Sequence, residues 1–192
     1  QYAKKSKKIL LANKESVICG WRILNKVLKK NRTKLIPIDS EHYSIKKLLE
    51  GNEKNYIKNI YITASGGPFY TTPIKKFKNI KISDAINHPN WKMGRKISTD
   101  SATLMNKLFE VIEAKNIFGI PYKKIEILIH PKSYVHAIVK FKNGLIKIIA
   151  HDTTMKIPIF NTLYYNNFDK TKIQTKKVNI KIINNLNFKK VD

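Results

Sequence analysis

The strongest constraint on the fold is a run of β-prone residues that ends abruptly at two glycines. Residues Ile57–Ala64 are rich in isoleucine, tyrosine and threonine, and Ser65-Gly66-Gly67-Pro68 follows at once. β-Branched and aromatic residues favour a strand, whereas glycine and proline end one. The sequence therefore predicts a strand that stops at a tight turn. Such a turn either only redirects the chain or exposes backbone N–H groups that can hold a phosphate.

Apolar runs with strand spacing alternate with segments of helical spacing along most of the chain. Further strands are predicted at residues 7–13, 34–38, 125–129, 135–141 and 145–149, with a hairpin turn at Asn143-Gly144. Helices are predicted at residues 16–30, 43–49 and 157–164, and a long one begins at a cap, Asp100 or Ser101, and closes at Gly119. Residues 69–94 are expected to be mainly loop. This pattern indicates an α/β fold with α+β character, in which helices pack on a mixed sheet.

The chain has 192 residues, of which 42% are hydrophobic, so it can bury one substantial core and a piece of a second domain. It starts at Gln1 with an apolar run that has no earlier strand to pair with, and we therefore expect an excerpt of a longer protein. No run approaches the roughly twenty apolar residues that cross a bilayer, so we expect no membrane partner. The single Cys19 cannot form an internal disulfide.

The charge of the chain is strongly positive. Its 38 Lys and Arg residues outnumber 13 Asp and Glu residues, which gives a formal net charge of +25. One alternative is therefore a basic nucleic-acid-binding module. Only three of the cations are arginine, however, and base readout favours the bidentate guanidinium. The lysines are spread along the chain with isoleucine and asparagine, as AT-rich codons would produce, so we expect no nucleic-acid partner. The positive field can still attract anionic substrates.

Two separate segments carry carboxylates that a shared cation would suit. Asp39 and Glu41 lie two positions apart after an apolar run, so on a strand both side chains would leave the same face. Neighbouring carboxylates repel each other unless a cation or a proton lies between them. Asn106 and Glu110 are four positions apart in a helical segment, with Lys107 beside them. These residues predict a site for a metal ion and a phosphate; the alternative is a solvated strand end and helix face.

Other polar and aromatic residues have plainer interpretations. Glu113 lies one turn beyond Glu110 and is expected to be a solvated helix residue. Trp91 stands in an apparent loop, where it covers either a ligand or a small satellite cluster. The histidines beside predicted strands are expected to be structural or solvated, without a chemical role; they are His42, His130, His136 and His151.

Five motifs occur in an order and spacing that resemble one enzyme family. They are Leu-Ala-Asn-Lys-Glu-Ser at residues 11–16, Pro-Ile-Asp-Ser-Glu-His at 37–42, Ala-Ser-Gly-Gly-Pro-Phe at 64–69, His-Pro-Asn-Trp-Lys-Met-Gly-Arg-Lys-Ile-Ser at 88–98, and the segment from Asp-Ser-Ala-Thr at 100–103 through Asn-Lys at 106–107 to Glu110. Together they resemble the 1-deoxy-D-xylulose 5-phosphate reductoisomerases. The resemblance covers residues 10 to about 165, and the basic tail carries little of it.

The resemblance implies a reaction and a domain organisation. Members of the family use NADPH to rearrange 1-deoxy-D-xylulose 5-phosphate and reduce it to 2-C-methyl-D-erythritol 4-phosphate, in non-mevalonate isoprenoid precursor biosynthesis. Residues 1–33 would be the C-terminal part of an N-terminal dinucleotide-binding domain, residues 34–165 the catalytic domain, and residues 166–192 a connector toward a C-terminal helical domain. Because the sequence lacks the glycine-rich front of the first domain and the helical domain, the chain alone is expected to be inactive.

The matching positions imply a role for each site residue. One Mg²⁺ or Mn²⁺, or alternatively Co²⁺, would be held by oxygen ligands from Asp39, Glu41 and Glu110. The implied catalytic residues are Lys14, Glu41 and His88. The implied contacts to the sugar-phosphate substrate are Lys14, Ser40, Glu41, Ser65, His88, Trp91, Ser101, Asn106, Lys107 and Glu110. The implied contacts to NADPH are Asn13, Glu15 and Gly94.

Within this set, the phosphate would be gripped by Ser65, Ser101, Asn106 and Lys107, and a place at a helix start would favour Ser101. Residues 88–98 would form a mobile lid that closes Trp91 and Met93 over the substrate and excludes water. One position departs from the family pattern, because Leu108 stands where glycine is usual. Leucine is the better helix former, so we expect this change to be tolerated.

Two other classes of function stay open. Another metal-dependent sugar-phosphate enzyme would act without a nicotinamide, and a nucleic-acid-binding module would not need the carboxylates. The resemblance also implies that the full-length protein is a homodimer in a bacterial cytoplasm, with a plastid-type organelle as the alternative location.

Overall fold

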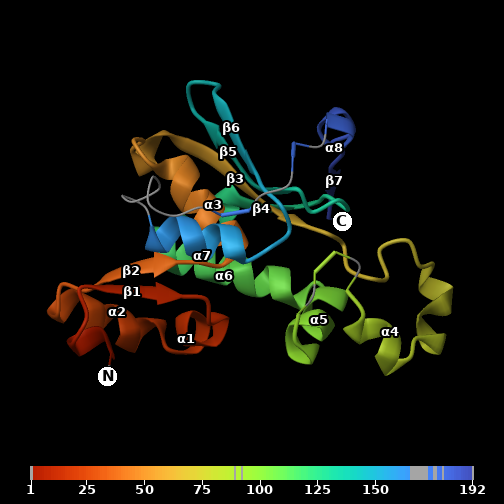
Figure 1. Cartoon of the computed structure of the whole chain (residues 1–192), viewed down its shortest axis with the longest axis horizontal. Helices are drawn as coiled ribbons and strands as arrows, with labels where there is room; N and C mark the ends of the chain where they lie inside the picture. Colours follow the sequence, from red (N-terminus) through yellow and green to blue (C-terminus); the bar gives the residue numbers. More distant parts are fainter. Residues whose placement is uncertain are drawn as a thin grey trace.

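The structure, a computed structural model, describes residues 2–88, 90, 91, 93–164, 173, 174, 177, 178 and 180–191. A mixed sheet lies at its centre with helices packed on it, and a smaller sheet lies at the end where the chain begins (Figure 1). This arrangement confirms the predicted α/β class with a mixed sheet. Among the helices that the structure describes, none is long and apolar enough to cross a membrane.

In the described part of the chain, the central sheet consists of β3 (Ile57–Ala64), β4 (Ile125–Ile129), β5 (Val135–Phe141), β6 (Ile146–Ala150) and β7 (Lys189–Lys190). Their order is β6-β5-β3-β4-β7, and β3 is parallel to β4 but antiparallel to β5. The predictions for β3, β4 and β5 are confirmed, and β6 begins one residue later than expected. Gly144 turns the chain between β5 and β6 at φ 89°, so the predicted hairpin is confirmed.

The smaller sheet pairs β1 (Lys8–Leu11) in parallel with β2 (Lys34–Pro37), and the connection contains α1 (Lys14–Cys19) and α2 (Trp21–Lys30). The single helix predicted here is wrong in two respects. The observed helix begins at Lys14 and not at residue 16, because the Asn13 side chain caps α1 by accepting a hydrogen bond from Ser16 N at 2.9 Å. It is also divided at Gly20, which ends α1 and precedes α2.

The apolar core lies between the central sheet and two helices, α3 (Ser40–Leu49) and α6 (Met105–Phe118). Its fully buried members include Ile45, Ile57, Ile60, Ile62, Ala114, Ala137 and Val139. Full burial of one such isoleucine stabilises the fold by about 1.5–3 kcal/mol. Because the core fixes both helices, it also fixes the polar side chains that α3 and α6 carry beside it.

A break divides the long helix that the sequence predicts between residues 100 and 119. α5 (Arg95–Ala102) ends first, Leu104 has a left-handed φ of 59°, and α6 then begins at Met105. The expected cap at Asp100 or Ser101 is therefore wrong, since Ser101 lies in the last turn of α5. The expected end at Gly119 is confirmed, with φ 69°.

The remaining segments contain more helix than expected. Residues 69–94 include a 3₁₀ helix at Ile74–Asn79 and α4 (Ile82–Ile86), and the predicted helix near residue 160 is α7 (Lys156–Leu163). Within the expected connector, the described parts include α8 (Ile180–Asn184) and β7, which pairs with the edge of β4. Further short 3₁₀ helices occur at Tyr2–Lys4, Lys54–Tyr56 and Tyr122–Lys124.

Candidate active site

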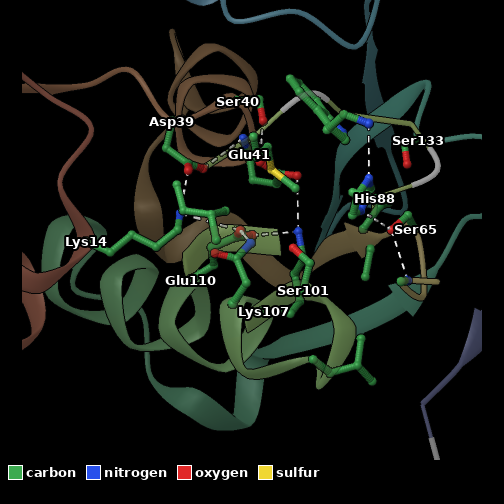
Figure 2. Close-up of a pocket in the computed structure, with 18 of the residues that line it drawn as sticks. Lys14, Asp39, Ser40, Glu41, Ser65, His88, Ser101, Lys107, Glu110 and Ser133 are labelled. Atoms are coloured by element: carbon green, nitrogen blue, oxygen red, sulfur yellow. Dashed lines mark hydrogen bonds and ion pairs between the residues drawn. The ribbon is translucent and has the colours of Figure 1, made fainter. Parts of the chain in front are cut away.

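A cavity of about 510 Å³ opens where β1, β2 and β3 end. Its walls come from the residues that follow these strands, from α5 and α6, and from the start of β5 (Figure 2). Ligands of α/β folds commonly bind beyond the carboxyl ends of parallel strands, where loops and helix starts meet. The predicted site residues that line the cavity are Asn13, Lys14, Glu15, Asp39, Ser40, Glu41, Ser65, His88, Trp91, Ser101, Asn106, Lys107 and Glu110.

Three of these residues form a carboxylate cluster. Oxygen atoms of Asp39, Glu41 and Glu110 lie within 4.8 Å of one another. The expectation that the first two sit on a strand is wrong, because β2 ends at Pro37. Asp39 instead caps α3, where its Oδ1 accepts a hydrogen bond from Glu41 N at 3.3 Å, and Glu41 lies in the first turn of that helix. The two side chains converge because a cap and a first-turn residue face the same end of the helix.

Two lysine ammonium groups reach into the carboxylate cluster. Lys14 Nζ lies 2.5 Å from Asp39 Oδ2 and 3.5 Å from Glu110 Oε1. Lys107 Nζ lies 3.1 Å from Glu41 Oε1 and 2.7 Å from Glu110 Oε2. Both lysines are buried. Buried charges need partners at this range, and each ammonium compensates two carboxylates of the cluster.

The burial and the mutual repulsion of the carboxylates change their pKa values in different directions. Burial, followed by repulsion from Glu41, raises the pKa of Glu110 to about 7. Burial also acts to raise the pKa of Asp39, but attraction to the Lys14 ammonium and to His42 together outweigh it and hold that pKa well below its usual range. For Glu41 burial is again the largest effect, but the Lys107 ammonium and weaker favourable contacts, among them the Ser40 hydrogen bond, together outweigh it and lower the pKa. Glu110 is therefore the member of the cluster that most easily takes a proton in the absence of a further cation.

A buried histidine lies behind the cluster and joins two of its members. His42 Nε2 lies 2.9 Å from the Glu110 carbonyl oxygen, and Nδ1 lies 3.2 Å from Asp39 Oδ1 in ion-pair rather than hydrogen-bond alignment. A carbonyl oxygen only accepts, and an unprotonated Nδ1 would set its lone pair against a carboxylate, so both ring nitrogens carry hydrogen. Burial acts to lower the pKa of His42, but Asp39 and then Glu113 outweigh it and raise that pKa to about 9. His42 is thus a buried imidazolium that orients Asp39, which agrees with the structural alternative of the prediction and not with the solvated one.

The prediction that Glu113 is a solvated helix residue is also wrong. It is only 3% exposed, not solvated, and its Oε2 lies 3.5 Å from Lys14 Nζ and 3.8 Å from His42 Nδ1. Its spacing of three from Glu110 on α6 is the signal that could have placed it on the same face. It supplies a fourth carboxylate behind the cluster, which explains how two buried cationic side chains can lie so close together.

The donor set fits a hard divalent cation. Mg²⁺ and Mn²⁺ prefer carboxylate oxygen ligands, and three such groups converge here. In the described part of the chain, Glu110 Oε2 is buried and meets Lys107 as an ion pair without a hydrogen bond, so it retains free acceptor capacity. Ser40 Oγ donates a hydrogen bond to Glu41 Oε2 and fixes that carboxylate.

On the other side of the cavity, two glycines bring a turn against α5. Gly66 and Gly67 have left-handed φ values of 88° and 73°. A Cβ atom at Gly67 would lie 2.7 Å from the Ser101 carbonyl oxygen, so the close approach requires glycine. This contact places Ser65 and Ser101 around one end of the cavity, next to Lys107 (Figure 2). A turn with adjacent hydroxyl, amide and ammonium donors is suited to a phosphate.

Comparison with known proteins agrees with this geometry. A family model described as the 1-deoxy-D-xylulose 5-phosphate reductoisomerase C-terminal domain matches residues 35–118. A protein of that enzyme name from Pelagibacter ubique is 60% identical over 97% of this chain and 48% of its own length. One from Clostridium kluyveri is 41% identical over the same shares. Over nearly its whole length, the chain is therefore similar to about half of a 1-deoxy-D-xylulose 5-phosphate reductoisomerase.

Solved structures of the family superpose closely on this chain. The Zymomonas mobilis reductoisomerase in complex with NADPH is 35% identical, with a TM-score of 0.87, and the match covers 99% of this chain and 48% of that one. A reductoisomerase in complex with NADPH, fosmidomycin and magnesium is 36% identical, with a TM-score of 0.87, over 100% of this chain and 49% of that one. The chain therefore spans about half the length of the reductoisomerases that it matches.

The segment that the reductoisomerase resemblance marks as a lid lies along one wall of the cavity. Trp91 and Met93 line the wall, and the Trp91 ring meets His136 edge-on with 6.1 Å between centroids. Pro89 and Lys92 lie outside the described residues, and the mobility of the segment stays a prediction. Gly94 directly precedes α5 but does not contribute to the cavity wall.

Several residues of the cavity wall were not predicted from the sequence. They are Lys96, Ser133, His136 and Met155, among others. Lys96 joins α5 to α1, because its Nζ lies 2.7 Å from Glu15 Oε1 and 2.8 Å from Asp100 Oδ2. The sequence has no local signal for Ser133 or Met155, since only the packing of β5 and α7 brings them to this cavity. For His136, the alternation of β5 did not indicate which face would meet the cavity.

Proposed function

We propose that this chain is the metal- and substrate-binding part of a 1-deoxy-D-xylulose 5-phosphate reductoisomerase. The reaction is the NADPH-dependent rearrangement and reduction of 1-deoxy-D-xylulose 5-phosphate to 2-C-methyl-D-erythritol 4-phosphate. The observation that carries the proposal is that three carboxylates and a phosphate-suited turn face each other across one cavity. Relatives with this fold bind NADPH, magnesium and fosmidomycin, which supports the same ligand classes here.

The metal would be Mg²⁺ or Mn²⁺, with Co²⁺ as an alternative, held by Asp39, Glu41 and Glu110. When bound, such an ion acts as a Lewis acid toward carbonyl and hydroxyl oxygens of the substrate. Lys14 contributes a positive charge to the same end of the cavity, since its ammonium contacts Asp39 and Glu110. Ser40 orients Glu41, and His42 orients Asp39 from behind.

The phosphate of the substrate would lie at the opposite end of the cavity. Ser65, Ser101, Asn106 and Lys107 supply hydroxyl, amide and ammonium groups there. Lys107 also contacts Glu41 and Glu110, so it links the phosphate end to the metal end. His88 and Trp91 would complete the pocket, and the full set of proposed catalytic residues is Lys14, Glu41 and His88.

The proposal also assigns the parts of the chain. Residues 1–33 would belong to the NADPH-binding domain, with Asn13, Glu15 and Gly94 near the cofactor, and residues 34–165 would form the catalytic domain. Residues 166–192 would connect to a helical domain, and the chain alone would not turn over. The complete protein would be a homodimer in the bacterial cytoplasm, in keeping with the bacterial sources of the relatives.

The test requires the completed protein, meaning this chain joined to the rest of the length that its relatives have. NADPH oxidation is followed with 1-deoxy-D-xylulose 5-phosphate and Mn²⁺. We expect metal-dependent oxidation that Glu110→Gln abolishes and that Glu53→Gln, at an exposed carboxylate outside the cavity, leaves unchanged. Turnover of a sugar phosphate without nicotinamide would favour another metal-dependent enzyme. Salt-sensitive nucleic-acid binding that ignores Glu110→Gln would favour the binding module.

A further inference from the structure

We infer that Asn90 is a positioning residue whose contacts hold His88 and, through it, the Ser65 hydroxyl in the orientation that binds a phosphate. The inference rests on the phosphate end of the proposed function. It adds a residue that is not among those lining the cavity. It also gives His88, which borders the cavity, a defined task at the phosphate end, which is to orient Ser65.

The Asn90 side chain joins two segments that are far apart in the sequence. Its Nδ2 donates hydrogen bonds to the Pro131 carbonyl oxygen at 2.6 Å and to Ser133 Oγ at 2.9 Å. Because a carbonyl oxygen only accepts, the NH₂ group of Asn90 and not its amide oxygen faces Pro131. Both hydrogens of the NH₂ group are therefore used. A carboxylate of the same size cannot replace them.

The turn that receives Asn90 is held in an unusual backbone conformation. Ser133 is only 6% exposed, and its φ of 50° lies in the left-handed region that non-glycine residues seldom adopt. Its N–H donates to the His130 carbonyl oxygen at 2.9 Å. A residue stays in this region when the surrounding structure fixes it, and such positions are frequent at functional sites. The turn therefore offers Asn90 a fixed support.

The backbone at Asn90 determines which nitrogen of His88 carries the hydrogen. His88 Nδ1 accepts hydrogen bonds from the N–H groups of Asn90, at 3.1 Å, and Trp91, at 3.0 Å. A ring nitrogen that accepts carries no hydrogen, so the hydrogen of the neutral ring is on Nε2. Burial, followed by the nearby Lys107 ammonium, lowers the pKa of His88 and favours this neutral ring.

The Nε2–H group of His88 points at Ser65. The distance from Nε2 to Ser65 Oγ is 3.0 Å, and Gly67 N–H donates to the same oxygen at 3.1 Å. Since the oxygen accepts from two donors, the hydroxyl hydrogen of Ser65 is left to point elsewhere, and Ser65 borders the cavity. Phosphate oxygens are acceptors, so this hydroxyl is preset as a donor for them. The contacts from Asn90 through His88 to Ser65 thus prepare the phosphate end before a ligand arrives.

Two isosteric substitutions in the completed protein test the inference. Asn90→Asp removes both NH₂ hydrogens, and Asn87→Asp makes the same change at an exposed side chain three residues earlier. The probe is inorganic phosphate, and ¹⁵N chemical shifts of His88 report the tautomer in the same samples. We expect Asn90→Asp to weaken phosphate binding about tenfold, from the loss of two hydrogen bonds, and to move the His88 shifts toward a mixture of tautomers. Asn87→Asp should change neither quantity.

If Asn90→Asp binds phosphate like the parent and keeps the Nε2–H tautomer, the inference is overturned. Should that variant fail to fold, Ser133→Ala is the second test, because it removes only one of the two acceptors of the Asn90 side chain. We expect phosphate binding to weaken about threefold and the His88 shifts to move in the same direction as in Asn90→Asp. No change in Ser133→Ala would also overturn the inference. Phosphate binding without any NADPH-dependent turnover in the parent would reject the proposed function and leave the role of Asn90 intact.

Discussion

The Lys14 ammonium and the Asp39 carboxylate, 25 positions apart, lie 2.5 Å from each other. This ion pair joins the start of α1 to the cap of α3. The same ammonium lies 3.5 Å from both Glu110 and Glu113 on α6. One cation therefore ties together three buried or partly buried carboxylates from two helices, and the cavity depends on it for charge balance.

Replacing Lys14 should destabilise the metal-free protein. Lys14→Met leaves the carboxylates of Asp39, Glu110 and Glu113 without their common cation, and breaking a buried pair costs about 3–5 kcal/mol. We expect a loss of that order in the free energy of unfolding, measured in urea on the completed protein. Lys26→Met, at an exposed lysine of α2, should be nearly neutral. Equal losses in the two variants would contradict the role given to Lys14.

The His42 imidazolium should make stability depend on pH. Its folded pKa of about 9 exceeds the ordinary value of 6.5, so the folded protein binds the proton more tightly. The stabilisation is complete below pH 6.5 and is lost as the pH rises through 9. We expect the free energy of unfolding of the metal-free protein to fall over this window. His42→Gln should flatten the slope, whereas an unchanged slope would show that His42 is not the titrating group.

The turn at Gly67 should not tolerate a side chain. Gly67→Ala introduces both an unfavourable φ, at 73°, and a Cβ atom 2.7 Å from the Ser101 carbonyl oxygen. Gly51→Ala is the matched control, because Gly51 has the same φ of 73° and open space around its Cβ position. The control should lose about 1–2 kcal/mol of stability from the backbone alone. Gly67→Ala should lose more and should also weaken the binding of inorganic phosphate; identical behaviour would contradict the close packing of turn and α5.

Divalent cations should stabilise the protein through Glu110. At a concentration about one hundred times the dissociation constant, a bound ion adds about 2.7 kcal/mol to the free energy of unfolding. We expect Mn²⁺ to raise the melting temperature of the parent and of Glu53→Gln. Glu110→Gln should lose most of this increase, since one of three ligands becomes neutral. A full increase in Glu110→Gln would place the bound ion elsewhere.

The strands and the similarity to reductoisomerases were predictable from sequence because their signals are local. Isoleucine-rich runs marked β3 and β4, and the glycine at 144 marked the hairpin. The ordered motifs also assigned residues of α1, α3 and α6 to a single site, although these helices are far apart along the chain.

Other features depend on tertiary packing and left no such signal. Leucine has no preference for the left-handed conformation that Leu104 adopts, so the break between α5 and α6 was not predicted. The ion pairs that the buried Glu113 makes with Lys14 and His42 join residues more than seventy positions apart along the chain. The geometry of Asp39 and Glu41 was also mistaken, because the chain turns into a helix directly after β2.

The most direct test of the central claim is to locate the metal. Crystals of the completed protein grown with Mn²⁺ would be examined by anomalous diffraction at the manganese edge. The account predicts one strong peak at bonding distance, about 2.1 Å, from oxygens of Asp39, Glu41 and Glu110. Lys14 and Lys107 should remain at the margin of that site. A peak bound elsewhere, or an ordered carboxylate cluster without manganese, would contradict the account.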